Sequence, residues 1–296
     1  MNIAITGANG FIGRNIRKHF EQKGYNVYPL TRDNVDLLDI KKVKEFITQN
    51  NIQVVFHTAI TGGRRTRPDT FQDFYNNIRM FEVLEKSCSD AEMLFNFGSG
   101  AEYSRYDEIF FKDEKDFGEK IPFDFYGFSK YLISKSIRSS KNRWVNLRIF
   151  NCFGLDEKKD RMITSSITKK LEGNKIVVHQ NKYMDFFYIE DLLRVIDFYI
   201  DNINNLESKP RELNLSYGRE HSCTTLNEIA EYIDSRVAPK VGVSILNSGY
   251  SRSYCGNNER LKSLGIDFVG IEKSIDFMFN TLKKEYDDVS LKSEEN

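Results

Sequence analysis

Short apolar runs alternate with longer amphipathic segments over the first half of the chain. The apolar runs are rich in β-branched residues and cover residues 3–6, 25–30, 53–57, 93–97 and 145–150. Apolar positions at helical spacing cover the segment from Phe11 to Gly24, and residues 40–50, 71–89 and 128–139. Strands and helices that alternate in this way predict βαβ units, with the helices on both faces of one parallel sheet. We therefore expect a doubly wound α/β fold.

The alternation loosens beyond Gly154. Helical patterns cover residues 161–172, 189–202, 226–235 and 271–284, and short strands are expected near Ile176 and Val243. We predict a main domain over residues 1–154, completed by about 185–202, and a smaller C-terminal α/β domain over 155–184 and 203–286. Residues 287–296 are mostly polar and are expected to form a frayed tail.

The charges of the chain balance, since 43 basic side chains are matched by 43 acidic ones. No net field favours nucleic acid or an anionic membrane, so neither is expected as a partner. The cysteines, Cys88, Cys152, Cys223 and Cys255, show no metal-ligand spacing, and we expect reduced thiols and no metal. The chain has no stretch of roughly 20 apolar residues and no pattern of a signal peptide, which favours the cytoplasm.

A glycine-rich turn, TGANGFIG, follows the first strand and precedes the first helix. Gly7 permits a tight turn, Gly10 lets the backbone approach a pyrophosphate, and Gly13 allows close helix packing. The amides of the helix N-terminus face the phosphates. This combination predicts a Rossmann-type dinucleotide site, with a glycine-rich loop that binds nothing as the alternative. The expected contacts are Gly7, Asn9, Gly10, Phe11, Ile12 and Gly13.

The end of the second strand indicates which dinucleotide binds. An NAD-selective site has an acidic residue there, which accepts hydrogen bonds from the adenosine ribose. This chain has Thr31 and Arg32 instead, and arginine suits a ribose 2′-phosphate through charge-assisted hydrogen bonds. NADP(H) is therefore expected. NAD is the alternative, if Asp33 or Asp36 binds the ribose.

A phenol and an ammonium are four residues apart in YGFSK, at the head of a predicted helix. This spacing places Tyr126 and Lys130 on one face, where the lysine can lower the pKa of the tyrosine and make it a proton donor near neutral pH. Ser99 follows the fourth strand, and ligands bind beyond the carboxyl ends of parallel strands. We expect Ser99 to hydrogen-bond a substrate carbonyl oxygen while Tyr126 delivers the proton; a turn-forming serine is the alternative.

These features together resemble the extended short-chain dehydrogenase/reductase family, especially its sugar-nucleotide epimerases, dehydratases and reductases. Besides TGANGFIG and YGFSK, the resemblance rests on VVFHTA at 54–59, NNI at 76–78, LRIFNCFG at 147–154 and DFFYIED at 185–191. It covers most of the chain. It implies an NAD(P)-dependent enzyme whose C-terminal domain binds a nucleotide-linked sugar.

The resemblance also implies roles for single residues. Asp36 with Leu37 resembles the pair that meets the adenine, and Ala59 resembles a backbone contact near the cofactor. Asn77 resembles the asparagine that braces the active-site end of its helix. In the same way Asn151 resembles the asparagine that holds the substrate diphosphate, Gly100 is expected beside the substrate, and His57 is expected to be structural. The family often forms homodimers through the helices of its third and fourth units, so a homodimer is expected.

Three departures from the family narrow the chemistry. The 4,6-dehydratases have Thr-Asp-Glu where this chain has Ser99-Gly100-Ala101, so both acids of the water elimination are missing. The cysteine of the epimerase-reductases that make GDP-fucose is replaced by Ala101. The arginine that often precedes the Asp-Phe motif is Met184 here. In the family this arginine contacts the substrate nucleotide. The residues that could make this contact instead are Arg252, Arg260 and the group Arg64, Arg65 and Arg67.

The leading hypothesis is NADPH-dependent reduction of a nucleotide-linked 4-keto-6-deoxysugar, as in the biosynthesis of surface-polysaccharide sugars. The second is an NAD-dependent C4 epimerase, which requires the same Ser99, Tyr126 and Lys130. The third is a dinucleotide-sensing protein without catalysis, although such relatives typically lose the tyrosine or the lysine. The identity of the sugar and of its nucleotide does not follow from the sequence.

Overall fold

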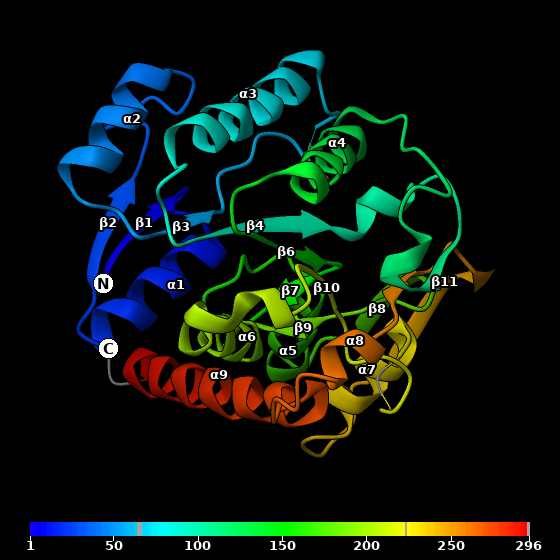
Figure 1. Cartoon of the computed structure of the whole chain (residues 1–296). Helices are drawn as coiled ribbons and strands as arrows, with labels where there is room; N and C mark the ends of the chain where they lie inside the picture. The colour runs from blue at the N-terminus through cyan, green and yellow to red at the C-terminus, as the bar shows by residue number, and fades with distance from the viewer. Residues whose placement is uncertain (64–66, 223, 295–296) are drawn as a thin grey trace.

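The computed structural model describes residues 1–63, 67–222 and 224–294, and its centre is one parallel sheet (Figure 1). The sheet has the strand order β10-β6-β4-β3-β1-β2. Its strands are β1 (Asn2–Thr6), β2 (Asn26–Leu30), β3 (Val54–His57), β4 (Met93–Ser99), β6 (Trp144–Ile149) and β10 (Glu212–Leu215). From β1 the chain adds β2 on one side of the sheet and then β3, β4, β6 and β10 on the other side. This reversal is typical of a doubly wound Rossmann-type sheet. Its carboxyl ends, where a ligand is expected, carry Thr6, Leu30, His57, Ser99 and Ile149.

Helices cover both faces of this sheet (Figure 1). Side chains alternate between the two faces of a strand, so Ile3 and Ile5 belong to one core and Ala4 to the other. The core around Ala4 is closed by α2 (Ile40–Gln49), α3 (Phe71–Ser87) and α4 (Phe125–Ser139). The core around Ile3 and Ile5 is closed by α1 (Phe11–Gln22), α6 (Ile189–Asp201) and α9 (Ile271–Glu294).

The remaining elements lie beyond the carboxyl ends of the central strands or extend the core around Ile3 and Ile5. Three pairs of short parallel strands occur here: β5 (Ile109–Lys112) with β12 (Tyr254–Gly256), β7 (Cys152–Phe153) with β9 (Phe187–Tyr188), and β8 (Ile176–Asn181) with β11 (Val243–Tyr250). The helices are α5 (Met162–Leu171), α7 (Leu226–Asp234), α8 (Glu259–Lys262) and the 3₁₀ segments η1 (Gly100–Tyr103), η2 (Glu114–Asp116) and η3 (Ile203–Ser208). Because β5 and β12 pair, residues about 145 apart in the chain are brought next to the end of β4.

The structure confirms the predicted fold class and differs in three local features. β10 pairs with β6 and completes the central sheet, whereas the sequence pattern placed its residues in the smaller domain. α4 begins at Phe125, one turn earlier than predicted, because Asp124 accepts a hydrogen bond from the amide of Gly127 at 2.8 Å and caps the helix. The division into two domains otherwise stays a prediction.

The predicted tail is also wrong in part, because α9 continues to Glu294. Within it, Lys283 Nζ lies 2.6 Å from Asp287 Oδ2, a spacing of four residues that favours helix. Among the described residues no helix is long and apolar enough to cross a membrane. Cys88, Cys152 and Cys255 are buried free thiols, and Cys223 lies outside the described residues.

α3 and α4, through which a homodimer was expected, pack against each other. Phe71 and Tyr75 of α3 are 63% and 50% exposed, and Phe125 of α4 is 41% exposed. The homodimer stays a prediction.

Candidate active site

The glycine-rich turn has the shape that a dinucleotide pyrophosphate requires. Gly7 has φ +65°, a conformation that favours glycine, and its amide donates to the carbonyl of Leu30 at 3.2 Å. A Cβ at Gly13 would lie 2.5 Å from the Gly7 carbonyl oxygen, so only glycine fits there. α1 begins after Gly10, and no described side chain caps it. Its first amides are therefore free to bind an anion, and the turn fits a pyrophosphate.

The residues predicted for the ribose and the adenine lie at the surface beside this turn. Thr31 donates from its amide to Asn34 Oδ1 at 2.8 Å, which shapes the loop after β2. Arg32 and Asp36 are both exposed. Asp36 Oδ1 already accepts from the amide of Leu38 at 3.0 Å, whereas Arg32 has no hydrogen bond or ion pair with the described part of the chain. The guanidinium of Arg32 is thus the more available of the two groups.

The three residues predicted as a catalytic trio lie at the end of β4 and at the start of α4, and their catalytic role stays a prediction. Ser99 is the last residue of the strand, and its Oγ accepts from the amide of Ala101 at 3.2 Å. Tyr126 lies in the first turn of α4 and hydrogen-bonds to Ser99. Lys130 is one turn further, buried, and its Nζ donates to the Phe97 carbonyl at 2.6 Å. A hydroxyl and a phenol therefore meet at the end of β4, and the ammonium of the following helical turn is held at the Phe97 carbonyl.

Burial shifts the pKa values of Tyr126 and Lys130 in opposite directions. It raises the pKa of Tyr126, and the hydrogen bond with Ser99 and the charge of Arg105 act in the opposite direction. It lowers the pKa of Lys130 to about 8, although the carboxylate of Glu102 opposes this. The sequence predicted that Lys130 would lower the pKa of Tyr126, whereas burial raises this pKa, and the effect of Lys130 on it stays a prediction. The cation that lowers the pKa of Tyr126 against burial is Arg105, which the sequence reasoning did not single out.

Arg105 is held over Tyr126 by two carboxylates. Its Cζ lies 5.2 Å from the centroid of the Tyr126 ring. Its guanidinium lies 3.3 Å from Asp69 Oδ2 and also pairs with Asp124, the cap of α4. Gly63 packs on the same ring, since a Cβ there would lie 2.6 Å from Tyr126 Cε2. The loop after β3 and the segment after η1 thus enclose the phenol.

Tyr254 is a second phenol at this centre that sequence reasoning missed. Its hydroxyl lies 3.1 Å from Ser99 Oγ, and burial raises its pKa. It comes from β12, in the part of the chain assigned to substrate binding. Its ring packs edge to face on Phe150, with 5.4 Å between centroids. No short motif surrounds Tyr254, so the sequence held no local signal for it.

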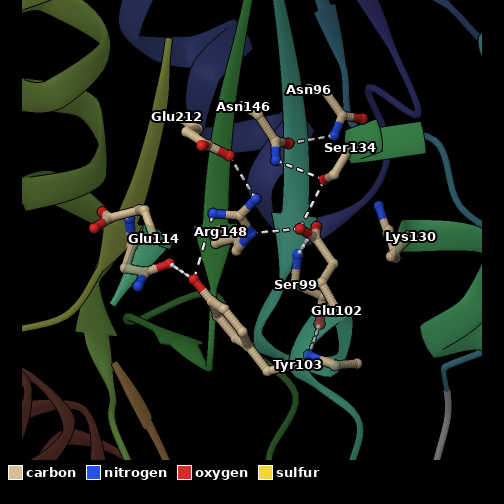
Figure 2. A network of polar contacts seen from close by, with 12 residues as sticks. Asn96, Ser99, Glu102, Tyr103, Glu114, Lys130, Ser134, Asn146, Arg148 and Glu212 are labelled. Carbon is tan, nitrogen blue, oxygen red and sulfur yellow. Dashed lines mark hydrogen bonds and ion pairs between the residues drawn. The ribbon is translucent and has the colours of Figure 1, made fainter. Parts of the chain in front are cut away.

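A buried ion pair supports the turn that carries Ser99 (Figure 2). The amide of Ser99 donates to Glu102 Oε1 at 2.9 Å, and Glu102 pairs with Arg148 on β6. Both side chains are fully buried, and Arg148 also binds Glu212 at 2.7 Å. Arg148, the arginine of the LRIFNCFG motif, therefore fixes Glu102 and, through it, the turn after β4.

A chain of polar side chains extends this network to α4 and across the sheet, as Figure 2 shows. Ser134 Oγ donates to Glu102 Oε2 at 2.7 Å and accepts from Asn146 Nδ2 at 2.7 Å. Asn146 Oδ1 in turn accepts from Asn96 Nδ2 at 2.6 Å. The helix of Tyr126 and the strand of Ser99 are thus joined by buried hydrogen bonds, which keep their relative position.

Two residues predicted as supports have supporting geometry. Asn77 accepts from the amide of Thr61 at 2.9 Å, donates to its carbonyl at 2.9 Å, and donates to Ser129 Oγ at 3.3 Å, so it ties the loop after β3 to α4. His57 is buried and its Nδ1 lies 2.9 Å from Thr6 Oγ1. Burial and the charge of Lys130 lower the pKa of His57 to about 3, so it is neutral. Asn77 therefore stabilises the loop after β3, and His57 stabilises the end of β1 through Thr6.

Ala59 and Gly100 line the site with backbone. The amide of Ala59 donates to Thr6 Oγ1 at 3.2 Å, and a Cβ at Gly7 would lie 2.8 Å from Ala59. A Cβ at Gly100 would lie 2.4 Å from Phe150 Cδ1. Gly100 therefore has no room for a side chain of any kind.

Asn151 is buried between β7 and the DFFYIED segment. Its Nδ2 donates to the Asp185 carbonyl at 2.8 Å, and its Oδ1 accepts from Arg161 at 3.4 Å. One hydrogen of its amide is left for a ligand, and Arg161, the N-cap of α5, adds a cation beside it. Its role toward a diphosphate stays a prediction.

The arginines that could replace the missing arginine at position 184 differ in their ion pairs and exposure. Met184 itself is buried. Arg67 makes a bidentate ion pair with Asp73, both contacts at 2.7 Å, and Arg260 lies 3.8 Å from Glu114. Arg64 and Arg65 lie outside the described residues. Arg252 is exposed and has no partner in the described chain, so among the described arginines of this group it is the most available for an anion.

Comparison with known proteins places these features in a family. Residues 3–216 match the model of the NAD dependent epimerase/dehydratase family. The chain is 26% identical over 235 residues to an ADP-L-glycero-D-manno-heptose-6-epimerase of Brachyspira hyodysenteriae, covering 68% of this chain and 73% of that protein. It is 26% identical over 246 residues to a GDP-L-colitose synthase of Yersinia pseudotuberculosis, covering 76% and 79%.

Solved structures share the whole fold at lower identity. A GDP-mannoheptose C4 reductase from Campylobacter jejuni with NADP bound superposes with a TM-score of 0.81 at 17% identity, covering 95% of this chain and 98% of that one. A UDP-glucose 4-epimerase from Thermotoga maritima superposes with a TM-score of 0.76 at 18% identity, covering 96% and 99%. At these identities the likeness establishes the common architecture.

Proposed function

Since the chain belongs to the NAD-dependent epimerase/dehydratase family, within the extended short-chain dehydrogenases/reductases, we propose that it uses NADPH to reduce a nucleotide-linked 4-keto-6-deoxysugar. The observation that carries the proposal is a complete hydride-transfer trio without dehydratase acids. Ser99 ends β4, and Tyr126 and Lys130 lie one turn apart at the start of α4, while the positions of the two acids are Gly100 and Ala101.

The geometry around Gly100 explains why an acid is excluded there. Phe150 occupies the space that a side chain at this position would need, 2.4 Å from the ideal Cβ. Ala101 is fully buried and carries no titratable group. Glu102, the acid that follows, is turned inward to Arg148. The turn after β4 thus offers the substrate a hydroxyl and no carboxylate.

The residues of this chain fit a dinucleotide cofactor. Gly7 and Gly13 leave room for a pyrophosphate, and the uncapped N-terminus of α1 supplies amides to it. Arg32 is exposed and free of described partners beside the loop that follows β2, which supports a ribose 2′-phosphate and therefore NADPH. An NADPH site favours net reduction, because the cellular NADPH pool supplies the reducing equivalents.

When bound, the cofactor supplies the hydride that adds to C4 of the substrate. Ser99 donates a hydrogen bond to the carbonyl oxygen, and Tyr126 gives this oxygen its proton as negative charge develops there. Burial keeps Tyr126 protonated at neutral pH, which suits a proton donor. Asn151, before β7, and Arg161, at the start of α5, would hold the diphosphate of the substrate, since the two side chains lie next to each other. The product gains two hydrogens in total.

The relatives support a sugar-nucleotide substrate. Their names specify ADP-, GDP- and UDP-linked sugars. The structural neighbours include a C4 reductase and a C4 epimerase, the two chemistries that the same trio can perform. An NAD-dependent C4 epimerase is therefore the second candidate, and a sensing protein without catalysis is the third.

A mass balance tests the proposal. Purified protein is incubated with NADPH and a panel of nucleotide-linked 4-keto-6-deoxysugars, and products are identified by NMR. We expect NADPH to disappear one for one with a product that has gained two hydrogens. Conversion of a non-keto sugar nucleotide into its C4 isomer without net NADPH consumption would establish the epimerase instead. Release of water from such a substrate would refute both candidates.

A further inference from the structure

We propose that the hydroxyl of Tyr254 positions Ser99 for the reaction, by donating a hydrogen bond to its Oγ so that the single proton of the serine points to the substrate carbonyl oxygen. The two oxygens lie 3.1 Å apart. The inference rests on the proposed function, because it assigns Ser99 the role of a hydrogen-bond donor to a carbonyl. Tyr254 acts through Ser99 and is a positioning residue.

Hydrogen-bond counting at Ser99 supports this direction. A serine hydroxyl has one hydrogen to donate and two lone pairs that accept. The amide of Ala101 fills one lone pair at 3.2 Å. If Tyr254 fills the other, the hydrogen of Ser99 can go only to Tyr126 or to a carbonyl that replaces this contact. Ser99 can then only donate a hydrogen bond toward the substrate, and stabilisation of a developing oxyanion requires such a donor.

Tyr254 has a proton to donate. It is largely surrounded by protein, and burial raises its pKa, so its phenol is neutral throughout the physiological range. Arg105 and Ser99 oppose this shift without reversing it. A neutral phenol that faces a serine oxygen can therefore act as the donor of the pair.

The backbone on both sides of Tyr254 keeps its hydroxyl in place. The amide of Tyr254 donates to the Tyr183 carbonyl at 2.9 Å, and its carbonyl accepts from the amide of Asp185 at 3.1 Å. Two residues further, the amide of Gly256 donates to Asp185 Oδ2 at 2.7 Å. β12 is thus anchored to the DFFYIED segment, and an element remote in sequence delivers a hydroxyl to the end of β4.

Four variants test the inference in the NADPH-dependent reduction: Tyr254→Phe, Ser99→Ala, the double variant, and Tyr183→Phe as the matched control. Tyr183 neighbours Tyr254, and its ring contacts Phe110, Phe111 and Tyr250, away from Ser99. We expect Tyr254→Phe to lower kcat about 10-fold, the scale of one lost hydrogen bond, with KM and NADPH affinity changed less than about twofold. Tyr183→Phe should retain the wild-type rate.

The double variant separates positioning from a general structural effect. If Tyr254 acts through Ser99, its removal has no further effect on kcat once Ser99 is alanine. A kcat of Tyr254→Phe within about twofold of wild type would overturn the inference, and so would a full effect of Tyr254→Phe in the Ser99→Ala background.

Failure of the proposed function is distinguishable from failure of this inference. If the wild-type protein works as an epimerase, the same four variants are compared in that reaction, which also passes through Ser99. Crystal structures of the wild type and of Tyr254→Phe give a readout without any substrate. A Ser99 Oγ beyond hydrogen-bond distance of the Tyr254 hydroxyl in the wild type, or unmoved in the variant, would overturn the inference whatever the enzyme reduces.

Discussion

The guanidinium of Arg105 lies over the ring of Tyr126, with 5.2 Å between Arg105 Cζ and the ring centroid. Asp69 and Asp124 hold it there, and its side chain is 36% exposed. A cation at this position favours the ionised form of the phenol, whereas burial of Tyr126 disfavours it. Burial is therefore the largest effect on the pKa of Tyr126, and the hydrogen bond with Ser99 and the charge of Arg105 oppose it.

The first prediction concerns pH. Reduction needs protonated Tyr126, so its rate declines as pH rises through the pKa of this group. Because the charge of Arg105 lowers this pKa, Arg105→Gln should raise it, and the alkaline limb of kcat/KM should move to higher pH. Because burial raises the pKa of Tyr126 above the ordinary phenol value of about 10, the profiles have to extend to about pH 11 to reveal the shift. Arg236→Gln is the control, since Arg236 lies over Tyr232 in the same way, at 4.0 Å, far from the site. Coincident alkaline limbs for wild type and Arg105→Gln would contradict the assignment.

The second prediction concerns the proton donor. Tyr126→Phe keeps the ring and removes the hydroxyl, so NADPH should still bind while kcat falls at least about 10²-fold. The control is Tyr131→Phe on the same helix, where the ring stacks on Phe117 at 4.9 Å. Turnover should be near that of the wild type in this control. Unchanged turnover in Tyr126→Phe would mean that the proton comes from another group.

The third prediction concerns cofactor choice. NADPH should bind more tightly than NADH, and Arg32→Ala should shrink the difference by about 1–3 kcal/mol, the scale of a charge-assisted contact. Arg17→Ala is the control, because Arg17 on α1 pairs with Glu21 at 2.7 Å and should not affect the preference. Affinities come from fluorescence titration with both nucleotides. Equal affinities in the wild type, or a preference that depends on Asp36 instead, would refute the role of Arg32.

The fourth prediction concerns the ion pair beneath Ser99. Arg148→Leu leaves the fully buried carboxylate of Glu102 without its partner and should lower the free energy of unfolding by about 3–5 kcal/mol. The exposed pair of Arg17 and Glu21 provides the comparison, since Arg17→Ala should cost less than about 1 kcal/mol. Urea denaturation measures both. Similar losses in the two variants would show that the buried pair contributes no more than a surface one.

The sequence by itself determined the features that depend on near neighbours in the chain. The period of apolar residues predicted most helices and strands of the central fold, since an amphipathic segment must bury one face. The glycines of the turn after β1 were informative because their backbone conformation and close contacts tolerate no side chain, as the positive φ of Gly7 shows. Tyr126 and Lys130 could be paired because four residues make one turn of a helix.

Only the tertiary structure decided which distant residues complete the site. Tyr254 lies 155 residues from Ser99, and Arg148 lies 46 residues from Glu102. Such pairs form when strands that are far apart in the chain become neighbours, as β5 and β12 do, and no periodicity records that pairing. β10 escaped prediction for the same reason, because its place beside β6 depends on the path of the whole chain. The local pattern of a segment shows which of its residues are buried. The elements that cover these residues are decided by the packing of the whole chain, since both faces of the sheet must be buried.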